Sequence, residues 1–331
     1  MKKSVGLSIL ILGAFIGAGF SSGREVYVFF ARFGWLAIPM AVFVGMCLYL
    51  LFMYFLNLSP HKNSTMYKIF EVVINISTFI LCSTMFAGCK ALTDMIGFWI
   101  LALTLIVPII QCFARLDGLK IVNYILLPLI LVCISVLAVI SPLRVVVVGV
   151  NLAFSSCAKY VGLNCILLSM FLIQIGENYT LKEKKIASII SSTMLTFFII
   201  LISLVIMGMD SSVVMSNMPL VTLAFSKGKA LGFVISLVVW AGLITTLVSG
   251  LFVIINTTSK VVGHRTKSIT NIVSVVVVLI CFAFSFVGWD FLTGKAYSVT
   301  GLISIIVIVG EILNEFLLNG GKIQIYKKNK K

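Results

Sequence analysis

The segment from Gly13 to Glu25 concentrates residues that could do chemistry inside the first hydrophobic stretch of the chain. It reads Gly-Ala-Phe-Ile-Gly-Ala-Gly-Phe-Ser-Ser-Gly-Arg-Glu, so glycines, serines and two charged residues interrupt an apolar run. Each glycine costs about 1 kcal/mol relative to alanine in a helix interior. A helix that only crosses a bilayer has no use for this composition. Either the glycines allow another helix to pack closely, or the backbone opens here to bind a ligand.

A second interruption occurs about midway along the sixth hydrophobic stretch, which contains Lys159, Tyr160, Gly162 and Asn164. The first and sixth stretches occupy equivalent positions in two halves of five stretches each. Paired interruptions of this kind indicate a transporter site at the interface of inverted repeats. We therefore expect helix breaks near Gly17 and Gly162. Tyr160 and Asn164 are one helical turn apart, so they could line one pocket or merely pack.

Three hydroxyl side chains stand close together in the eighth hydrophobic stretch, at Thr245, Thr246 and Ser249. Hydroxyl and carbonyl oxygens are hard ligands that suit a hard cation. The plainer alternative is that these hydroxyls bond to carbonyl groups of their own helix, as serine and threonine often do inside membrane helices.

Charged residues inside a membrane segment are costly and indicate function. Lys159 could pair with Glu25, contact a solute carboxylate or replace a cation; alternatively it extends outward to water. Arg24 and Glu25 could form an outer gate, with each other or with Asp290. A plain pair at the membrane interface is the equally open alternative.

The composition is that of a membrane protein. Hydrophobic residues make up 61% of the 331 residues and charged residues 11%, with a mean hydropathy of +1.19; soluble domains carry about 25% charge. The first stretch is longer than a signal-peptide core and lacks a clear cleavage site, so we expect it to be retained. The eight cysteines show no spacing typical of a disulfide framework or a zinc site. No catalytic motif is present, so we do not expect an enzyme.

Ten membrane spans can be drawn, and they form a single transmembrane domain over residues 1–331. Repeat one covers about 5–140 and repeat two about 147–318, followed by a basic cytoplasmic tail at 319–331. Most of the 25 basic residues fall in alternate loops and in this tail, which predicts that both termini are cytoplasmic. The loop 209–230 could cap a pathway or rest on the outer interface. The expected spans are 5–31, 34–56, 66–90, 96–113, 119–140, 147–175, 186–208, 231–258, 269–287 and 296–318.

The segment beginning Gly13-Ala14-Phe15-Ile16-Gly17-Ala18-Gly19-Phe20 resembles the broken first helix of the LeuT-like, or amino acid/polyamine/organocation, superfamily. It is most similar to the YkvI-like bacterial membrane proteins, which carry the same signature and a Tyr-x-x-x-Asn in the sixth span. The resemblance implies an all-α fold with a 5+5 inverted repeat and broken first and sixth helices.

The resemblance also implies a site. The substrate would contact Ala18, Gly19, Phe20 and Ser21, with Lys159, Tyr160, Gly162 and Asn164 from the sixth span. A sodium ion would bind the carbonyls of Gly13 and Ile16 together with Thr245, Thr246 and Ser249. Phe20 occupies the position where relatives with a second sodium ion have asparagine, which puts that second ion in doubt.

These observations predict a secondary transporter in a bacterial-type inner membrane. It would move a small polar or zwitterionic, amino-acid-like solute by alternating access coupled to sodium or to protons. The partners expected are the lipid bilayer and the solute, with no organic cofactor and no nucleic acid. The alternative is a non-transporting membrane protein, a sensor or assembly partner, that keeps the transporter fold.

Overall fold

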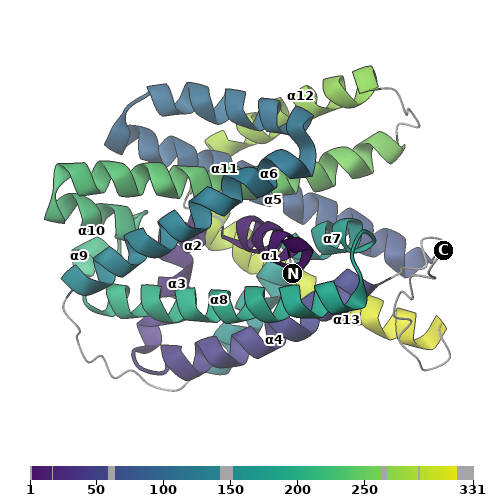
Figure 1. The fold of residues 1–331 in the computed structure, drawn as a ribbon, viewed down its shortest axis with the longest axis horizontal. Coiled ribbons are helices and arrows are strands. Elements are labelled where there is room, and N and C mark those ends of the chain that lie inside the picture. Colours follow the sequence, from purple (N-terminus) through teal and green to yellow (C-terminus); the bar gives the residue numbers. More distant parts are fainter. Residues whose placement is uncertain are drawn as a thin grey trace.

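The computed structural model describes residues 2–16, 18–58, 64–141, 152–261, 267–289 and 291–318, and within these ranges it contains helices and no β-strand (Figure 1). Three features expected from the sequence lie outside the described residues: the break at Gly17, the gate partner Asp290 and the basic tail 319–331. The all-α expectation is therefore met over the part of the chain that is described.

The first hydrophobic stretch forms several short helices instead of one continuous helix. Helix α1 (Lys2–Phe15) ends just before Gly17, α2 (Ala18–Ser21) makes a single turn, and α3 (Arg24–Phe29) follows, before the 3₁₀ turn η1 (Ala31–Phe33). Gly23 joins α2 to α3 with φ +83°, a left-handed conformation that favours glycine because other residues have a Cβ atom.

The remaining helices of the first half are α4 (Ala37–Asn57), α5 (Thr65–Ile96) and α6 (Trp99–Ile140). Helix α6 has 42 residues and covers both the fourth and the fifth expected spans. The short loop expected near residues 114–118 is helical. A straight helix of this length would extend about 63 Å, roughly twice the hydrocarbon thickness. Figure 1 shows that the two ends of α6 run in different directions.

The second half begins with α7 (Ala153–Gly176), which bends by 48° between Ala153–Asn164 and Leu168–Gly176. The helix continues through Gly162, so the bend lies a few residues beyond the position expected. Added atoms at Gly162 would collide with Ile305 of α13, so this glycine allows close helix packing. The other elements are α8 (Leu181–Met207), α9 (Ser211–Val214), α10 (Pro219–Lys227), α11 (Lys229–Val261), α12 (Lys267–Phe284), η2 (Ser285–Val287), η3 (Phe291–Ala296) and α13 (Tyr297–Leu318).

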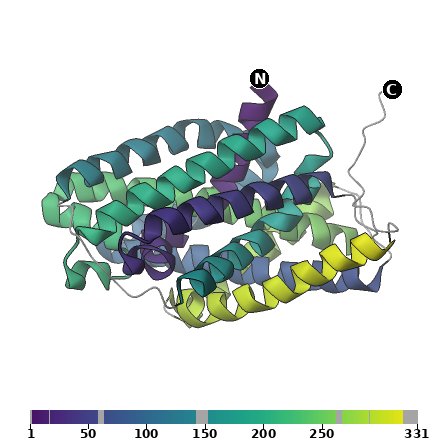
Figure 2. The same cartoon turned by 90° about the horizontal axis from the view of Figure 1, so that it is seen from below.

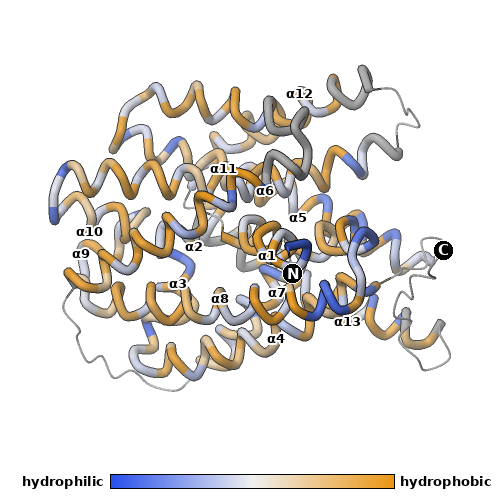
Figure 3. Tube along the Cα trace, in the orientation of Figure 1, coloured by the Kyte–Doolittle hydropathy of each residue, from blue (hydrophilic) through white to orange (hydrophobic). Residues whose placement is uncertain are grey.

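Five described helices are long and apolar enough to cross a membrane, or six when the two parts of α7 count as one span. Apolar residues run along most of their length (Figure 3). Large hydrophobic side chains are also exposed on the outside, among them Leu50, Val139 and Ile306. An apolar exterior of this kind indicates contact with lipid. Three shorter apolar helices accompany them, at Trp99–Ile109, Ile272–Val287 and Val299–Asn314.

The broken first segment runs in the same direction as α8. Ser8 of α1 meets α8 near its start, since its hydroxyl lies 3.5 Å from the Ala187 carbonyl oxygen. Further on, Phe20 packs against Phe198. Helix α8 begins at a capping box, in which Thr180 and Glu183 bond each other's backbone N–H groups, and this arrangement fixes where the helix starts.

Two further pairings complete the surroundings of the break. Helix α11 runs antiparallel to α5, with Leu247 beside Cys82 and Gly250 beside Thr78. Helix α13, yellow in Figure 2, packs against α7 and α5. The break in the first segment therefore lies between α11 on one side and α7 and α8 on the other.

Candidate functional site

The end of α1 meets the middle of α11 through an unusual group of oxygen atoms. The Thr246 hydroxyl oxygen lies 3.0 Å from the carbonyl oxygen of Ile16 and 3.2 Å from that of Gly13. Thr245 donates a hydrogen bond of 3.0 Å to the Gly242 carbonyl. Positions 242, 245 and 246 share one face of a helix. We name the three carbonyl oxygens of Gly13, Ile16 and Gly242 and the hydroxyls of Thr245 and Thr246 the oxygen cluster.

Close packing between the helices brings the oxygen cluster together. A Cβ atom at Gly242 would lie 3.6 Å from the Ile16 carbonyl oxygen and 3.6 Å from the side chain of Ser21, so glycine lets α11 approach the break. Gly13 belongs to the last turn of α1 and Ile16 follows that helix; carbonyls at a helix end commonly lack a partner within the helix. Thr245 and Thr246 are both 2% exposed. The oxygen cluster is thus a buried set of neutral, hard oxygen atoms.

Gly13 serves close packing as well as the oxygen cluster. An added Cβ atom would collide with the amide of Asn123 on α6. Asn123 also donates to the Ile9 carbonyl of α1 at 3.5 Å. The two interpretations of this glycine, helix packing and an opened backbone, therefore apply together.

Ser249 belongs to α11 but not to the oxygen cluster. Its hydroxyl donates to the Thr245 carbonyl of its own helix at 2.9 Å. Thr245 also donates within α11, to Gly242, so both show the structural alternative considered for all three hydroxyls. By contrast, Thr246 reaches out of its helix to α1. Ser249 therefore fits the structural interpretation, whereas Thr246 makes a contact between helices that a cation ligand could make.

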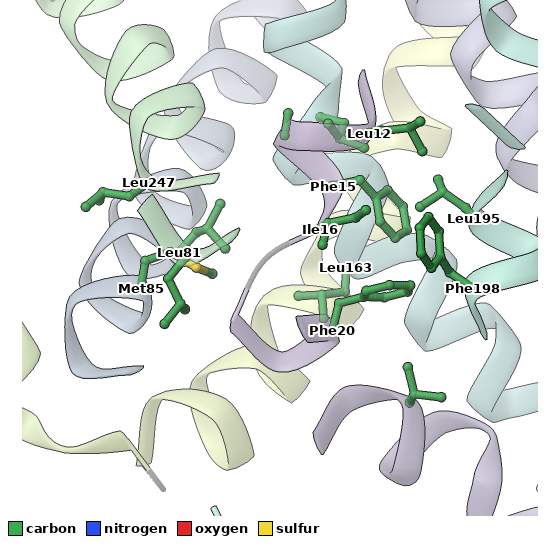
Figure 4. Close-up of a cluster of buried hydrophobic side chains, with 14 of the residues drawn as sticks. Leu12, Phe15, Ile16, Phe20, Leu81, Met85, Leu163, Leu195, Phe198 and Leu247 are labelled. Atoms are coloured by element: carbon green, nitrogen blue, oxygen red, sulfur yellow. The ribbon is translucent and has the colours of Figure 1, made fainter. Parts of the chain in front are cut away.

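The ring of Phe20 points into an apolar cluster. It is fully buried and lies edge-to-face with Phe15 and Phe198, at centroid distances of 6.0 and 6.3 Å. Figure 4 shows these rings on one side of the break, while Leu81, Met85 and Leu247 lie on the other. Any role of Phe20 in binding would thus fall to its backbone. Only the backbone of Ala18 and Gly19 is described, as part of α2.

The residues expected from the sixth span separate into two groups. Tyr160 is fully buried and packs against Phe15, Phe29 and Phe30 of the first segment. Asn164, one turn further, is buried and donates to the Tyr160 carbonyl at 3.0 Å.

Lys159 and Gly162 do not face the interior region that contains Tyr160 and Asn164. Lys159 is exposed, so its side chain does not join Tyr160 and Asn164 in the interior. Successive helical residues point about 100° apart, which explains why neighbours differ in this way. The outward orientation considered for Lys159 is the one found. Gly162 faces α13, as described above.

Arg24 and Glu25 do not pair with each other in the described structure. The guanidinium of Arg24 donates to the Val214 carbonyl at 3.3 Å and lies 6.0 Å from the Tyr27 ring centroid. Glu25 lies in the first turn of α3 and is partly buried. The expected pairing with Asp290 concerns a residue outside the described ranges.

The loop 209–230 contains α9 and α10 and is attached to the first segment. The N–H of Leu220 donates to the Ser22 carbonyl at 3.1 Å. Leu220, Val221 and Ala224 of α10 are buried. The loop 209–230 therefore packs against the first segment next to its break and does not merely rest on the surface of the protein.

Sequence reasoning missed three contributors to this region. Gly242 completes the oxygen cluster, and its spacing of three and four residues from the two threonines could have revealed it. Ser156 donates to the Phe29 carbonyl at 2.9 Å and anchors the end of α3 to α7. Asn123 packs on Gly13. The last two depend on tertiary contacts that carry no local signal.

No family model matches this chain. A search of curated proteins also gives no match. Among solved structures, the chain is similar to the crystal structure of a mutant manganese transporter from Eremococcus coleocola. The TM-score is 0.66 at 12% identity, over 98% of this chain and 81% of that one. At this identity the likeness defines the fold alone. The chain has the composition of an integral membrane protein and shares its fold with that manganese transporter.

The oxygen cluster differs in kind from a transition-metal site. Within the described ranges, no group of three or more His, Cys, Asp or Glu side chains is placed to hold a metal ion. The oxygen atoms that do converge are neutral carbonyl and hydroxyl oxygens.

Proposed function

We propose that this chain is a secondary transporter that moves a small polar or zwitterionic, amino-acid-like solute by cation-coupled alternating access. The observation that carries the proposal is the contact of Thr246 with the carbonyls of Gly13 and Ile16, at the point where α1 ends. This contact joins the broken first segment to α11 through groups that can bind a cation.

The chemistry of the oxygen cluster favours sodium as the coupling ion. Neutral oxygen ligands can replace the hydration shell of an alkali cation, as carbonyl oxygens do in ion channels. The Thr246 hydroxyl can turn its hydrogen away and present a lone pair, because a hydroxyl both donates and accepts. The carbonyl end of a helix also carries partial negative charge. Manganese, the ion in the name of the structural neighbour, is better suited to carboxylate ligands.

The solute would bind just beyond the cation, at the start of α2. The backbone N–H groups of Ala18, Gly19 and Phe20 follow the break, and unpaired N–H groups at such a break bind carboxylates well. Ser21 is buried against Gly242. A cation bound to Ile16 and a solute bound after it would thus share one short segment, which provides a route for coupling.

Contacts between helix ends support ten spans with cytoplasmic termini. Ser64 and Asn314 hydrogen bond at 3.0 Å, and both lie at ends that the charge distribution assigns to the inside. Leu56 and Gly176, also assigned to the inside, lie in contact. The bond from Ser156 to Phe29 joins two ends assigned to the outside. Ten spans result when α1–α3 count once and α6 twice, in a 5+5 arrangement. We also propose that the chain belongs to the YkvI-like branch that its first segment resembles.

The proposal can be tested with full-length protein in liposomes. Uptake of a panel of labelled amino acids and small amines would be measured with an inward sodium gradient and with potassium in its place. We expect at least one solute to accumulate and to do so faster in sodium. Thermal stabilisation of the solubilised protein by the same solute would provide a second measurement.

A negative result in these uptake and stabilisation experiments would contradict the proposal. Absence of both uptake and stabilisation across the panel, in either salt, would exclude transport of this solute class. The alternative of a sensor or assembly partner predicts stabilisation by a solute without uptake. The ending of α1 at Phe15, where a non-transporting helix could have run straight, favours transport.

A further inference from the structure

One face of α11 continues from the oxygen cluster toward the helix end that the charge distribution assigns to the inside. Ser249 follows Thr245 by one turn on this face, and Asn256 follows Ser249 by two turns, since residues four and seven apart share one side of a helix. At 1.5 Å per residue, Asn256 lies about 15 Å from Thr246 along the helix axis. A route from the oxygen cluster to the inner side along this face therefore passes Asn256.

The exposure of this face changes near Asn256. Thr246 and Ser249 are 2% and 3% exposed, and Val253 is fully buried. Phe252 and Asn256 are partly exposed. The face is therefore closed as far as Val253 and begins to reach the surface at Asn256.

The side chain of Asn256 is bonded to α7 at this level. Its Nδ2 atom donates to Oε1 of Gln174 at 3.1 Å. About one turn nearer the oxygen cluster, the rings of Phe171 and Phe252 lie edge-to-face at a centroid distance of 6.1 Å. An aromatic contact followed by an amide pair thus closes the space between α7 and α11 on the inner side.

An amide pair suits a contact that must open and close. When the two helices separate, each amide can exchange its partner for water, so the net cost of breaking the bond is small. An apolar pair in the same place would instead expose apolar surface to water. The bond between Gln174 and Asn256 can therefore be reversible where a purely apolar contact would hold the helices together.

The bend of α7 allows its inner part to move separately. Gln174 belongs to Leu168–Gly176, which is bent by 48° from the preceding part of the helix. Tyr160, which packs on Phe15 and Phe30 of the first segment, lies before the bend. A shift of Leu168–Gly176 would thus leave this packing in place.

We propose that Gln174 and Asn256 form the inner gate of the transport pathway, which opens when Leu168–Gly176 moves away from α11 and the amide bond breaks. The inference rests on the transport function proposed above. Another side-chain bond joins helices at the same end, from Asn314 of α13 to Ser64 at 3.0 Å. It is not part of the gate, because neither residue belongs to α7 or α11.

The gate can be tested by the reactivity of a cysteine placed behind it. Ser249→Cys is nearly isosteric and lies between the oxygen cluster and the gate. Inside-out membrane vesicles that contain full-length Ser249→Cys would be treated with a membrane-impermeant maleimide, and the labelling rate would be measured by mass spectrometry. We expect labelling to be slow with the gate intact and about three- to tenfold faster when Asn256→Ala or Gln174→Ala is added. The same protein without Ser249→Cys sets the background.

A matched control separates opening of the gate from general loosening. Asn314→Ala also removes a side-chain bond between helices at the inner end, and it should leave the labelling rate of Ser249→Cys unchanged. Gln174→Ala and Asn256→Ala together should accelerate labelling no more than either alone, since both remove one bond. An unchanged rate in either folded single variant, or equal acceleration by Asn314→Ala, would overturn the gate.

The labelling needs no solute, so its outcome is separate from that of the uptake measurement. Failure of the labelling prediction in a protein that accumulates a solute would overturn the gate alone. Absence of uptake and stabilisation across the solute panel would overturn the transport function, and the gate with it.

Discussion

The hydroxyl oxygen of Thr246 lies 3.0 Å from the carbonyl oxygen of Ile16, although 230 residues separate them in the chain. This contact connects the end of α1 to the middle of α11, the most deeply buried of the long apolar helices. A hydroxyl that bonds only within its own helix would add nothing to tertiary structure. Thr246 instead links two elements that must move relative to each other if access alternates.

Thr246→Val should remove the sodium dependence of solute binding while preserving side-chain volume. Loss of one oxygen ligand should weaken sodium binding by about tenfold or more. Sodium affinity would be measured as the concentration that gives half-maximal stabilisation by a solute. Thr257 is the matched control, because its hydroxyl bonds only to Val253 of its own helix. If Thr257→Val and Thr246→Val respond to sodium alike, the oxygen cluster does not bind the ion.

Gly13→Ala should destabilise the protein by about 1–3 kcal/mol, because the new methyl group collides with the Asn123 side chain. The measurement is thermal unfolding in detergent. Asn123→Ala removes the obstructing amide, so the double variant should recover much of the loss. Two losses that simply add would show that Asn123 is not what confines this glycine.

The sequence was informative where a residue type is locally unfavourable. Four glycines in an apolar stretch predicted an interrupted first helix; α1 ends at Phe15, before the undescribed Gly17, and the broken-helix arrangement stays a prediction. The resemblance of this stretch to a broken first helix, and not its local cost, named Gly13, Ile16 and Thr246, which the structure brings together; the ion itself remains a proposal. Local cost is visible in a sequence because it needs no knowledge of neighbours.

The sequence was uninformative where packing decides. Nothing local distinguishes Lys159, which is exposed, from its neighbour Tyr160, which is fully buried. Gly162 predicted a break, but it serves contact with Ile305, and the bend of α7 lies beyond Asn164. The direction of a side chain depends on which helix lies opposite, and that depends on the whole fold.

Gly23→Ala should also be destabilising, by about 1–2 kcal/mol, since Gly23 has φ +83° and a Cβ atom there would lie 2.9 Å from Leu220. Gly228 provides the comparison, because a Cβ atom at that position meets nothing within 4 Å. Gly228→Ala should be nearly neutral in the same unfolding assay. Equal effects at both positions would mean that the turn between α2 and α3 does not require glycine.

Arg24→Gln should loosen the α9–α10 segment from the first helix, because the bond to the Val214 carbonyl is lost. A bond of this kind is worth about 1–2 kcal/mol, so amide hydrogen exchange between residues 211 and 224 should accelerate roughly five- to thirtyfold. Mass spectrometry of exchanged peptides would measure it. Arg32→Gln is the control, since Arg32 stacks on Phe33 instead. Unchanged exchange in Arg24→Gln would show that this residue does not hold the segment in place.

The proposed topology predicts opposite labelling of two exposed positions at the ends of α8 and α9. Met215 follows α9 and is 63% exposed, whereas Lys185 lies in the first turns of α8 and is also exposed. With cytoplasmic termini, Met215→Cys should react with a membrane-impermeant maleimide added to intact cells, because it faces outward. Lys185→Cys should react only after permeabilisation. The unaltered protein sets the background, and its described cysteines are buried except for the partly buried Cys47. Reversal of the two patterns would place the basic loops outside and require the opposite orientation of every helix.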